Sequence, residues 1–406
     1  MKRRLLPILM TLVLVCALPI WAAFVTSGDV TNPLVSTAWA TLPDLQAKID
    51  AAADNATITL DSNTEIAATL QITKNLTLDL NGCTLRMTGT GSVLKVSGRA
   101  TLTITDSSAA KSGTITGGNA EYGGGVYVDD YAALKMTGGC ITGCHASRGG
   151  GGIYSSGNLY MGGTAKIEKC TGSDDAIWNR ENSDIYADGG TVDGTVNNQG
   201  TIKRSEGAAA VTVFNGTVYN RSAGTIIAGI YNGTVENNGT ISGGTFCGGV
   251  TIRKGSWVWE RTGSISGGTF YSSIVNEAGP ERVTGVTFAV TFDRGDGTKT
   301  EPTPVKYNDL VPKPTAPTKS GYTFTGWEDA NGAYDFNTPV TGPLTLTAKW
   351  EKVPSSGGNY YYHPTTDTKA DDAKGSPKTA DPGVALYGAL ALLSLTGMVA
   401  LNGKKR

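Results

Sequence analysis

Three cysteines and a histidine lie close together near the middle of the chain and are the residues best suited to bind a metal. Cys140 and Cys144 precede His145, and Cys170 comes 26 residues after Cys144. The order Cys-x3-Cys-His is not a standard zinc pattern. We therefore expect neither a metal site nor another cofactor.

Carboxylates that could cleave a polysaccharide are few. Hydrolysis needs two carboxylates that flank the scissile bond, and elimination needs an acidic calcium cluster beside a basic residue. The candidates are Asp129, Asp130, Asp174, Asp175, Arg148 and Arg180. Neighbouring residues on a strand point to opposite faces, so neither Asp pair converges unless it lies in a loop. We interpret them as solvated turn acids and expect no enzyme, with a surface polysaccharide lyase or glycoside hydrolase as the alternative.

Histidine and aromatic residues add no catalytic group to this picture. The chain has two histidines, and His363 lies in a polar segment beside three tyrosines, so no Ser-His-Asp arrangement can be drawn. Trp257, Trp259 and Tyr271 could stack on sugars, but we expect them to cap the last coils of the fold.

The charge balance excludes one class of partner. Lys plus Arg number 34 and Asp plus Glu number 35, which gives a net charge of -1. No Lys/Arg cluster occurs inside the globular region, so the chain has no field for gripping a polyphosphate. We expect no nucleic acid partner.

Short strands in repeated phrases must position these residues. The phrase GGGVYVDDYAALKMTGGCITGCHA at 123–146 returns as GGGIYSSGNLYMGGTAKIEKCTG at 150–172, NGTVYN at 215 returns as NGTVEN at 232, and SGGTF occurs at 242 and 266. Leu76, Leu78 and Leu80 alternate with polar residues, which is the period of a strand. Repetition of this kind indicates stacked coils, because only a neighbour about 4.8 Å away satisfies the backbone of each coil.

This pattern resembles the pectate-lyase-like β-helix regions of bacterial surface proteins. The resemblance covers about residues 55–288 and includes NLTLDLNGCTL at 75–85 and TLTIT at 101–105. It implies an all-β chain in which residues 41–288 form a right-handed parallel β-helix. A β-sandwich or β-propeller is the rival, but sandwiches need no copies of one phrase and propeller blades repeat at longer periods.

The repeat offset places two cysteines in equivalent positions. Cys144 and Cys170 are 26 residues apart, close to the 27 between Gly125 and Gly152. If they stack in neighbouring coils, their Cα atoms lie about 5 Å apart, within reach of a disulfide. The alternative is two buried free thiols that behave as small hydrophobic groups.

Residues 289–351 form a second module. Its large aromatic side chains are too many for about 60 residues unless most of them form its core. The stretch closely resembles the internalin-type B repeat, also called the Listeria-Bacteroides repeat, a small β-grasp-like module of Gram-positive surface proteins. The matching motifs are VTFD at 290, GYTFTGW at 321–327, YDFNTPVT at 334–341 and LTAKW at 346–350. The family implies spacing or adhesive display.

Both ends carry export and membrane signals. Residues 1–40, with a basic start and an apolar run, predict a signal peptide cleaved after Ala40; an uncleaved anchor helix is the alternative. Residues 352–382, rich in Pro, Ser, Thr and charge, predict a disordered spacer. Residues 383–406 predict a transmembrane helix with a basic tail left inside.

The C-terminal order of parts resembles the cell-wall sorting signal of Gram-positive bacteria. The motif is Ser376, Pro377, Lys378, Thr379 and Ala380, followed by the apolar span and the basic tail. The resemblance implies a sortase whose cysteine attacks the Thr379 carbonyl and transfers the chain to peptidoglycan. A retained membrane anchor is the alternative.

Together these features predict a protein of the cell wall and extracellular surface, with a membrane-anchored precursor. We expect a non-enzymatic adhesin or structural stalk that contacts a host or bacterial surface glycan or protein.

Overall fold

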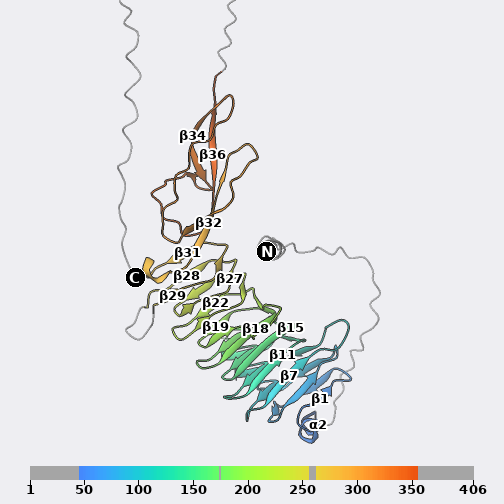
Figure 1. Ribbon diagram of the computed structural model, residues 1–406. Coiled ribbons are helices and arrows are strands. Elements are labelled where there is room, and N and C mark those ends of the chain that lie inside the picture. The colour runs from blue at the N-terminus through green and yellow to red at the C-terminus, as the bar shows by residue number, and fades with distance from the viewer. Residues whose placement is uncertain (1–44, 173–174, 256–261, 355–406) are drawn as a thin grey trace, which may run out of the picture. The chain divides into compact units, whose positions relative to one another are not determined.

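The computed structural model describes residues 45–172, 175–255 and 262–354. The predicted signal peptide, spacer, sorting motif and apolar span lie outside these residues, as do Asp174, Trp257, Trp259 and His363. The described chain begins with a short helix, α2 (Leu45–Ala51). It continues as strands that stack coil upon coil from β1 through β31 (Figure 1).

Three parallel ladders make up the coil. The first ladder contains β1 (Ala56–Thr59), β4 (Leu76–Asp79), β7 (Thr101–Thr105), β11 (Ala133–Met136), β15 (Asn158–Glu168), β18 (Asp184–Asp193), β20 (Thr201–Lys203), β23 (Thr225–Ile226), β26 (Thr240–Ile241) and β29 (Ser264–Ile265). The second contains β2 (Thr64–Ile66), β5 (Thr84–Met87), β8 (Thr114–Thr116), β12 (Cys140–Thr142), the later halves of β15 and β18, β21 (Val213–Phe214), β24 (Ile230–Tyr231), β27 (Thr245–Phe246) and β30 (Thr269–Phe270).

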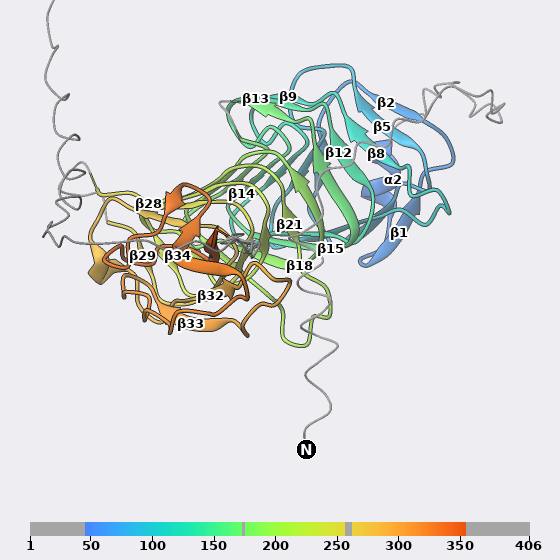
Figure 2. The ribbon, with the colours of Figure 1, turned by 90° about the horizontal axis from the view of Figure 1, so that it is seen from above.

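The third ladder has ten strands, one from each coil. They are β3 (Leu70–Ile72), β6 (Leu94–Val96), β10 (Val126–Val128), β14 (Ile153–Ser155), β17 (Ile177–Asn179), β19 (Val196–Asn198), β22 (Val218–Asn220), β25 (Val235–Asn237), β28 (Val250–Ile252) and β31 (Ile274–Asn276). A short extra ladder joins β9 (Asn119–Tyr122), β13 (His145–Gly149) and β16 (Thr171–Gly172), and Figure 2 shows β9 beside β13. The prediction of a stacked parallel coil is confirmed, and its right-handed turn stays a prediction.

Alternating side chains fill the inside of the coil. Leu76, Leu78 and Leu80 are buried, as their spacing predicted. Four aromatic rings, those of Phe214, Tyr231, Phe246 and Phe270, stack in successive coils with centroids 5.0, 4.9 and 4.8 Å apart. Ring faces thus continue through the core in the same register as the backbone.

A row of asparagines also runs through the interior. Asn179, Asn198, Asn220 and Asn237 have no exposed surface, and each amide donates to the next at 2.8, 2.8 and 2.7 Å. Asn237 Nδ2 donates to the carbonyl of Ser264 at 3.0 Å. The row satisfies buried amides that would otherwise each cost free energy.

The coil is covered at its first turn by α2, which buries Leu45 and Ile49. Gln46 of this helix bonds the backbone of Gln71 through both its amide oxygen (2.7 Å) and its amide nitrogen (3.1 Å). At the far side, Phe270 of the last coil contacts Phe288 with ring centroids 6.5 Å apart.

A small mixed sheet follows the coil. Its order is β33 (Thr303–Lys306), β32 (Thr287–Asp293), β36 (Leu344–Lys352), β34 (Tyr322–Asp329) and β35 (Gly332–Ala333), and only β32 and β36 are parallel. Trp327 is buried against Phe292 and Phe324, with ring centroids 4.9 and 5.4 Å away. Most of the aromatic side chains therefore do form the core, whereas Tyr322 is 39% exposed.

Candidate functional site

The repeat register brings Cys144 and Cys170 to one corner of the coil. His145 pairs with Thr171 in neighbouring strands, and Thr171 N donates to the carbonyl of Cys144 at 2.9 Å. Cys140, Cys144 and Cys170 are free thiols. A hydrogen bond with the Cys170 thiol, together with burial, raises the pKa of Cys144, and burial raises the pKa of Cys140 to about 11. High thiol pKa values make these cysteines poor nucleophiles at neutral pH.

His145 lies beside these thiols but faces outward. Its Nδ1 is 3.2 Å from the hydroxyl of Thr171, and the side chain is exposed. Within residues 45–172, 175–255 and 262–354, no group of three His, Cys, Asp or Glu side chains is placed to hold a metal ion.

The acidic candidates separate into different environments. Asp129 lies 3.9 Å from Lys95, and Arg148 pairs with Glu121 at 2.8 Å on the extra ladder. The interpretation of Asp175 as a solvated turn acid is wrong, because this side chain is only 4% exposed and accepts a hydrogen bond from Asn197. It is shielded where the turn before β17 packs on the coil.

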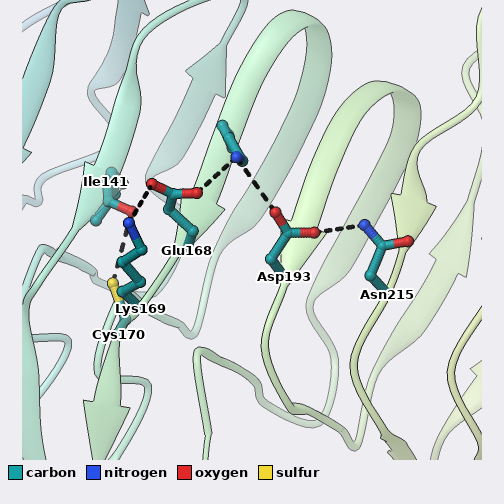
Figure 3. A network of polar contacts seen from close by, with 7 residues as sticks. Ile141, Glu168, Lys169, Cys170, Asp193 and Asn215 are labelled. Atoms are coloured by element: carbon teal, nitrogen blue, oxygen red, sulfur yellow. Dashed lines mark hydrogen bonds and ion pairs between the residues drawn. The ribbon is translucent and has the colours of Figure 1, made fainter. Parts of the chain in front are cut away.

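Charged and amide side chains form a row beside the second ladder (Figure 3). Lys166 contacts Glu168 at 2.5 Å and Asp193 at 3.4 Å. Asn215 donates to Asp193 and accepts from Asn232 at 2.8 Å. The hydrogen bond from Lys166 lowers the pKa of Glu168. Because these charges are paired, the row ties coils together and offers no carboxylic acid for catalysis near neutral pH.

Asp130 and Arg180, in contrast, do come together. They line a notch of about 390 Å³, which we call the first notch, formed by the turns that link the third ladder to the first. Ser156 forms its floor, and Tyr131 and Glu181 line its sides. The sequence analysis named Asp130 and Arg180 but missed Tyr131 and Glu181, because turns of different coils meet only when the strand register is known.

A second notch lies next along the same edge. Its volume is about 370 Å³, and Glu181 and Asn182 line both notches. Gln199 and Ser222 complete its polar lining. Carboxylate, guanidinium, amide and hydroxyl groups can each bond the hydroxyls of a sugar, so this edge is the candidate site with the most varied chemistry.

An outward-facing aromatic strip lies on the third ladder. The rings of Tyr127 and Tyr154 stack with centroids 5.1 Å apart, and Trp178 follows 6.3 Å from Tyr154. Tyr122 of β9 packs over Tyr154 at 4.9 Å. Tyr154 is only 7% exposed. Its rings therefore stabilise the extra ladder more than they offer a binding surface.

Membrane attachment is not visible in this part of the protein. Among the residues described here, none forms a helix long and apolar enough to cross a bilayer. The apolar span on which the prediction rests belongs to residues 383–406, outside the described ranges.

Known proteins match the second module and stretches of limited length. Residues 288–349 match the Listeria-Bacteroides repeat domain. Over 95 residues, 22% of this chain, the sequence is 36% identical to internalin H of Listeria monocytogenes. Over 68 residues, 16% of this chain, it is 35% identical to a protein of Evansella cellulosilytica whose name describes it as a Gly-rich membrane protein. The aligned parts cover 16% and 8% of those two relatives.

No solved structure is significantly similar to the chain. The predicted B repeat is confirmed by the family match over residues 288–349. The repeat domain and the distant similarity to internalin H together point to a protein of the cell surface.

Proposed function

We propose that this chain is a non-enzymatic adhesin or stalk protein, displayed on a Gram-positive cell and anchored to its wall by a sortase. The observation that carries the proposal is the Listeria-Bacteroides repeat at residues 288–349, directly after the parallel coil. The name internalin H, borne by a relative, adds support for surface display.

The coil suits a display role on physical grounds. Its ten strands in the third ladder, about 4.8 Å apart, extend over roughly 45 Å. Backbone groups of each coil bond the next coil, and the interior rows of Asn198, Asn220 and Phe246 follow the same register. Such a body presents its edges and faces without requiring a ligand to order it.

Anchoring would use the motif Ser376–Ala380 as a sortase substrate. The enzyme's cysteine thiolate attacks the Thr379 carbonyl, the bond from Thr379 to Ala380 breaks, and the released amine takes a proton. An amine of the peptidoglycan cross-bridge then displaces the thiol and forms a new amide. Replacing Thr379 by Ala should move the protein from the murein-bound fraction to the membrane or medium, whereas Thr368→Ala in the spacer should not.

Adhesion is tested on whole cells. Cells that display the full chain are compared with deletion cells for retention on arrays of glycans and matrix proteins. Greater retention of the displaying cells supports an adhesin. Equal retention on every surface leaves the stalk role and removes the adhesive one.

Polysaccharide cleavage is the second candidate, because Asp130, Arg180 and Glu181 line one notch. Two carboxylates beside a guanidinium are groups that hydrolysis or elimination can use. The purified full chain is incubated with glucans, uronans and peptidoglycan, and new reducing ends are measured. Release that is lost in both Asp130→Asn and Glu181→Gln supports an enzyme, and release unchanged by them places any activity elsewhere.

A further inference from the structure

The edge between the third and first ladders has turns of alternating length. Four residues separate β10 from β11 (129–132), β17 from β18 (180–183) and β22 from β23 (221–224). Two residues separate β14 from β15 (156–157) and β19 from β20 (199–200). Each short turn therefore lies between two longer turns that project beyond it. We call this series the notched edge.

Glycine keeps the short turns recessed. A Cβ on Gly157 would lie 2.1 Å from the carbonyl oxygen of Ala132, and one on Gly200 would lie 1.9 Å from that of Ser183. Since no side chain fits there, each short turn packs directly beneath the backbone of the preceding long turn. The two notches are thus fixed by main-chain contacts, not by side chains that could swing to fill them.

The notches repeat along the edge at a fixed spacing. The first lies over Ser156 and the second over Gln199, two coils further on. Two steps of about 4.8 Å place them roughly 10 Å apart. This spacing is comparable with the length of a disaccharide in an extended β-linked chain, so neighbouring repeats of one polymer could enter both notches.

An aromatic ring stands at the rim of the first notch. Tyr131 is 82% exposed, and its φ of +65° lies in the left-handed region that bulky residues rarely adopt. The Arg99 guanidinium carbon lies 5.9 Å from the ring centroid. The turn thus holds a large amphipathic ring in solvent at a conformational cost, beside a polar hollow.

The charges of the first notch disfavour an anionic ligand. Asp130 and Glu181 bring two negative charges and Arg180 brings one positive charge. In the second notch, Glu181 accompanies the uncharged Asn182, Gln199 and Ser222. Amide and hydroxyl groups match the hydroxyls and acetamido groups of uncharged sugars, while a uronate would meet net repulsion.

We propose that the notched edge is a binding site for an extended, uncharged glycan, with sugar units in both notches and one ring stacked on Tyr131. This inference rests on the proposed adhesin function and names its ligand class and site. Arg180 and Glu181 bond sugar hydroxyls between the two notches, and the Tyr131 ring contacts the apolar face of a sugar.

The test uses full-length protein in detergent and measures affinity by calorimetry. The probes are β-linked gluco-, manno- and N-acetylglucosamine oligomers, from disaccharide to hexasaccharide, with oligogalacturonate as the anionic probe. We expect at least one neutral series to bind, with affinity rising until the oligomer spans both notches. Tighter binding of oligogalacturonate, or no binding of any neutral oligomer, would overturn the proposal.

Variants locate the binding on this edge. Tyr131→Asn removes the ring while tolerating the positive φ, so affinity should fall about tenfold, and Tyr131→Phe should keep most of it. Ser156→Trp should fill the first notch and reduce binding further. Tyr271→Asn, at another exposed tyrosine of the coil, is the matched control. Equal loss in Tyr131→Asn and Tyr271→Asn, with both proteins folded by circular dichroism, would refute the assignment.

Failure of this inference can be told apart from failure of the proposed function. If displaying cells adhere only to a protein ligand and Tyr131→Asn cells adhere as well as wild type, the adhesin proposal stands and the glycan site falls. If the purified chain binds a neutral glycan at the notched edge but cells show no adhesion, the glycan site stands and the adhesive role falls.

Discussion

Asn220 is the position at which the interior of the coil can be tested most sharply. Its Oδ1 accepts from Asn198 at 2.8 Å, and its Nδ2 donates to Asn237 Oδ1 at 2.7 Å and to the carbonyls of Gly224 and Thr240 at 3.2 Å. The side chain has no exposed surface. The change Asn220→Leu keeps a similar volume but removes every one of these bonds.

The expected cost follows from the partners that lose their bonds. The amide oxygen of Asn237 and the carbonyl groups would be left without this donor, while Asn198 Nδ2 keeps its bond to the carbonyl of Gly200 at 3.0 Å. An unsatisfied buried polar group costs about 1–3 kcal/mol. Two such groups and a partly weakened third give a loss of about 3–5 kcal/mol in the free energy of unfolding.

The repeated phrase supplies a matched control. Asn215 begins the phrase NGTVYN that Asn220 ends, but Asn215 is exposed. Asn215→Leu should cost no more than about 1 kcal/mol, because water replaces its lost partners. Urea unfolding of both variants, followed by circular dichroism, measures the difference. Equal destabilisation of the two proteins would refute the reasoning.

Three further predictions concern the core, the thiols and the response to acid. Phe246→Ala removes a ring between Tyr231 and Phe270 and should cost about 3–5 kcal/mol in urea unfolding, with a smaller loss for Phe246→Leu. Mild oxidation with oxidised glutathione should link Cys144 to Cys170 and raise stability by about 3 kcal/mol; peptide maps without that cross-link would contradict it. Burial of Asp106 raises its pKa, but bonds from Gly113, Gly82 and Ser108 N–H groups outweigh this and lower it. Its stabilisation is therefore present above about pH 4 and lost as pH falls through the lowered value, so Asp106→Asn should flatten the drop in thermal midpoint below pH 4; an unchanged slope would contradict it.

The sequence predicted those parts of the fold that repeat. SGGTF at 242 and 266 foretold a 24-residue step, and the structure pairs Phe246 with Phe270 in register. The 26-residue step between Cys144 and Cys170 likewise equals the pairing of His145 with Thr171. Repeats are visible because equivalent inward positions demand the same residue type in each coil.

The notched edge could not be predicted in the same way. Its shape depends on whether two or four residues separate successive strands, and strand ends are fixed only by pairing with neighbouring coils. Tyr131 and Glu181 are 50 positions apart in sequence and carry no shared motif. Asp175 was misread for a related reason, since burial of a turn residue depends on the coil that packs over it.

The central claim, covalent display on the cell wall, is tested most directly by mass spectrometry of the protein released from purified walls by muramidase. The account predicts a C-terminal peptide that ends at Thr379 and carries peptidoglycan cross-bridge residues, with no peptide from residues 380–406. A mature protein that still contains residues 380–406 and is recovered from membranes would contradict it.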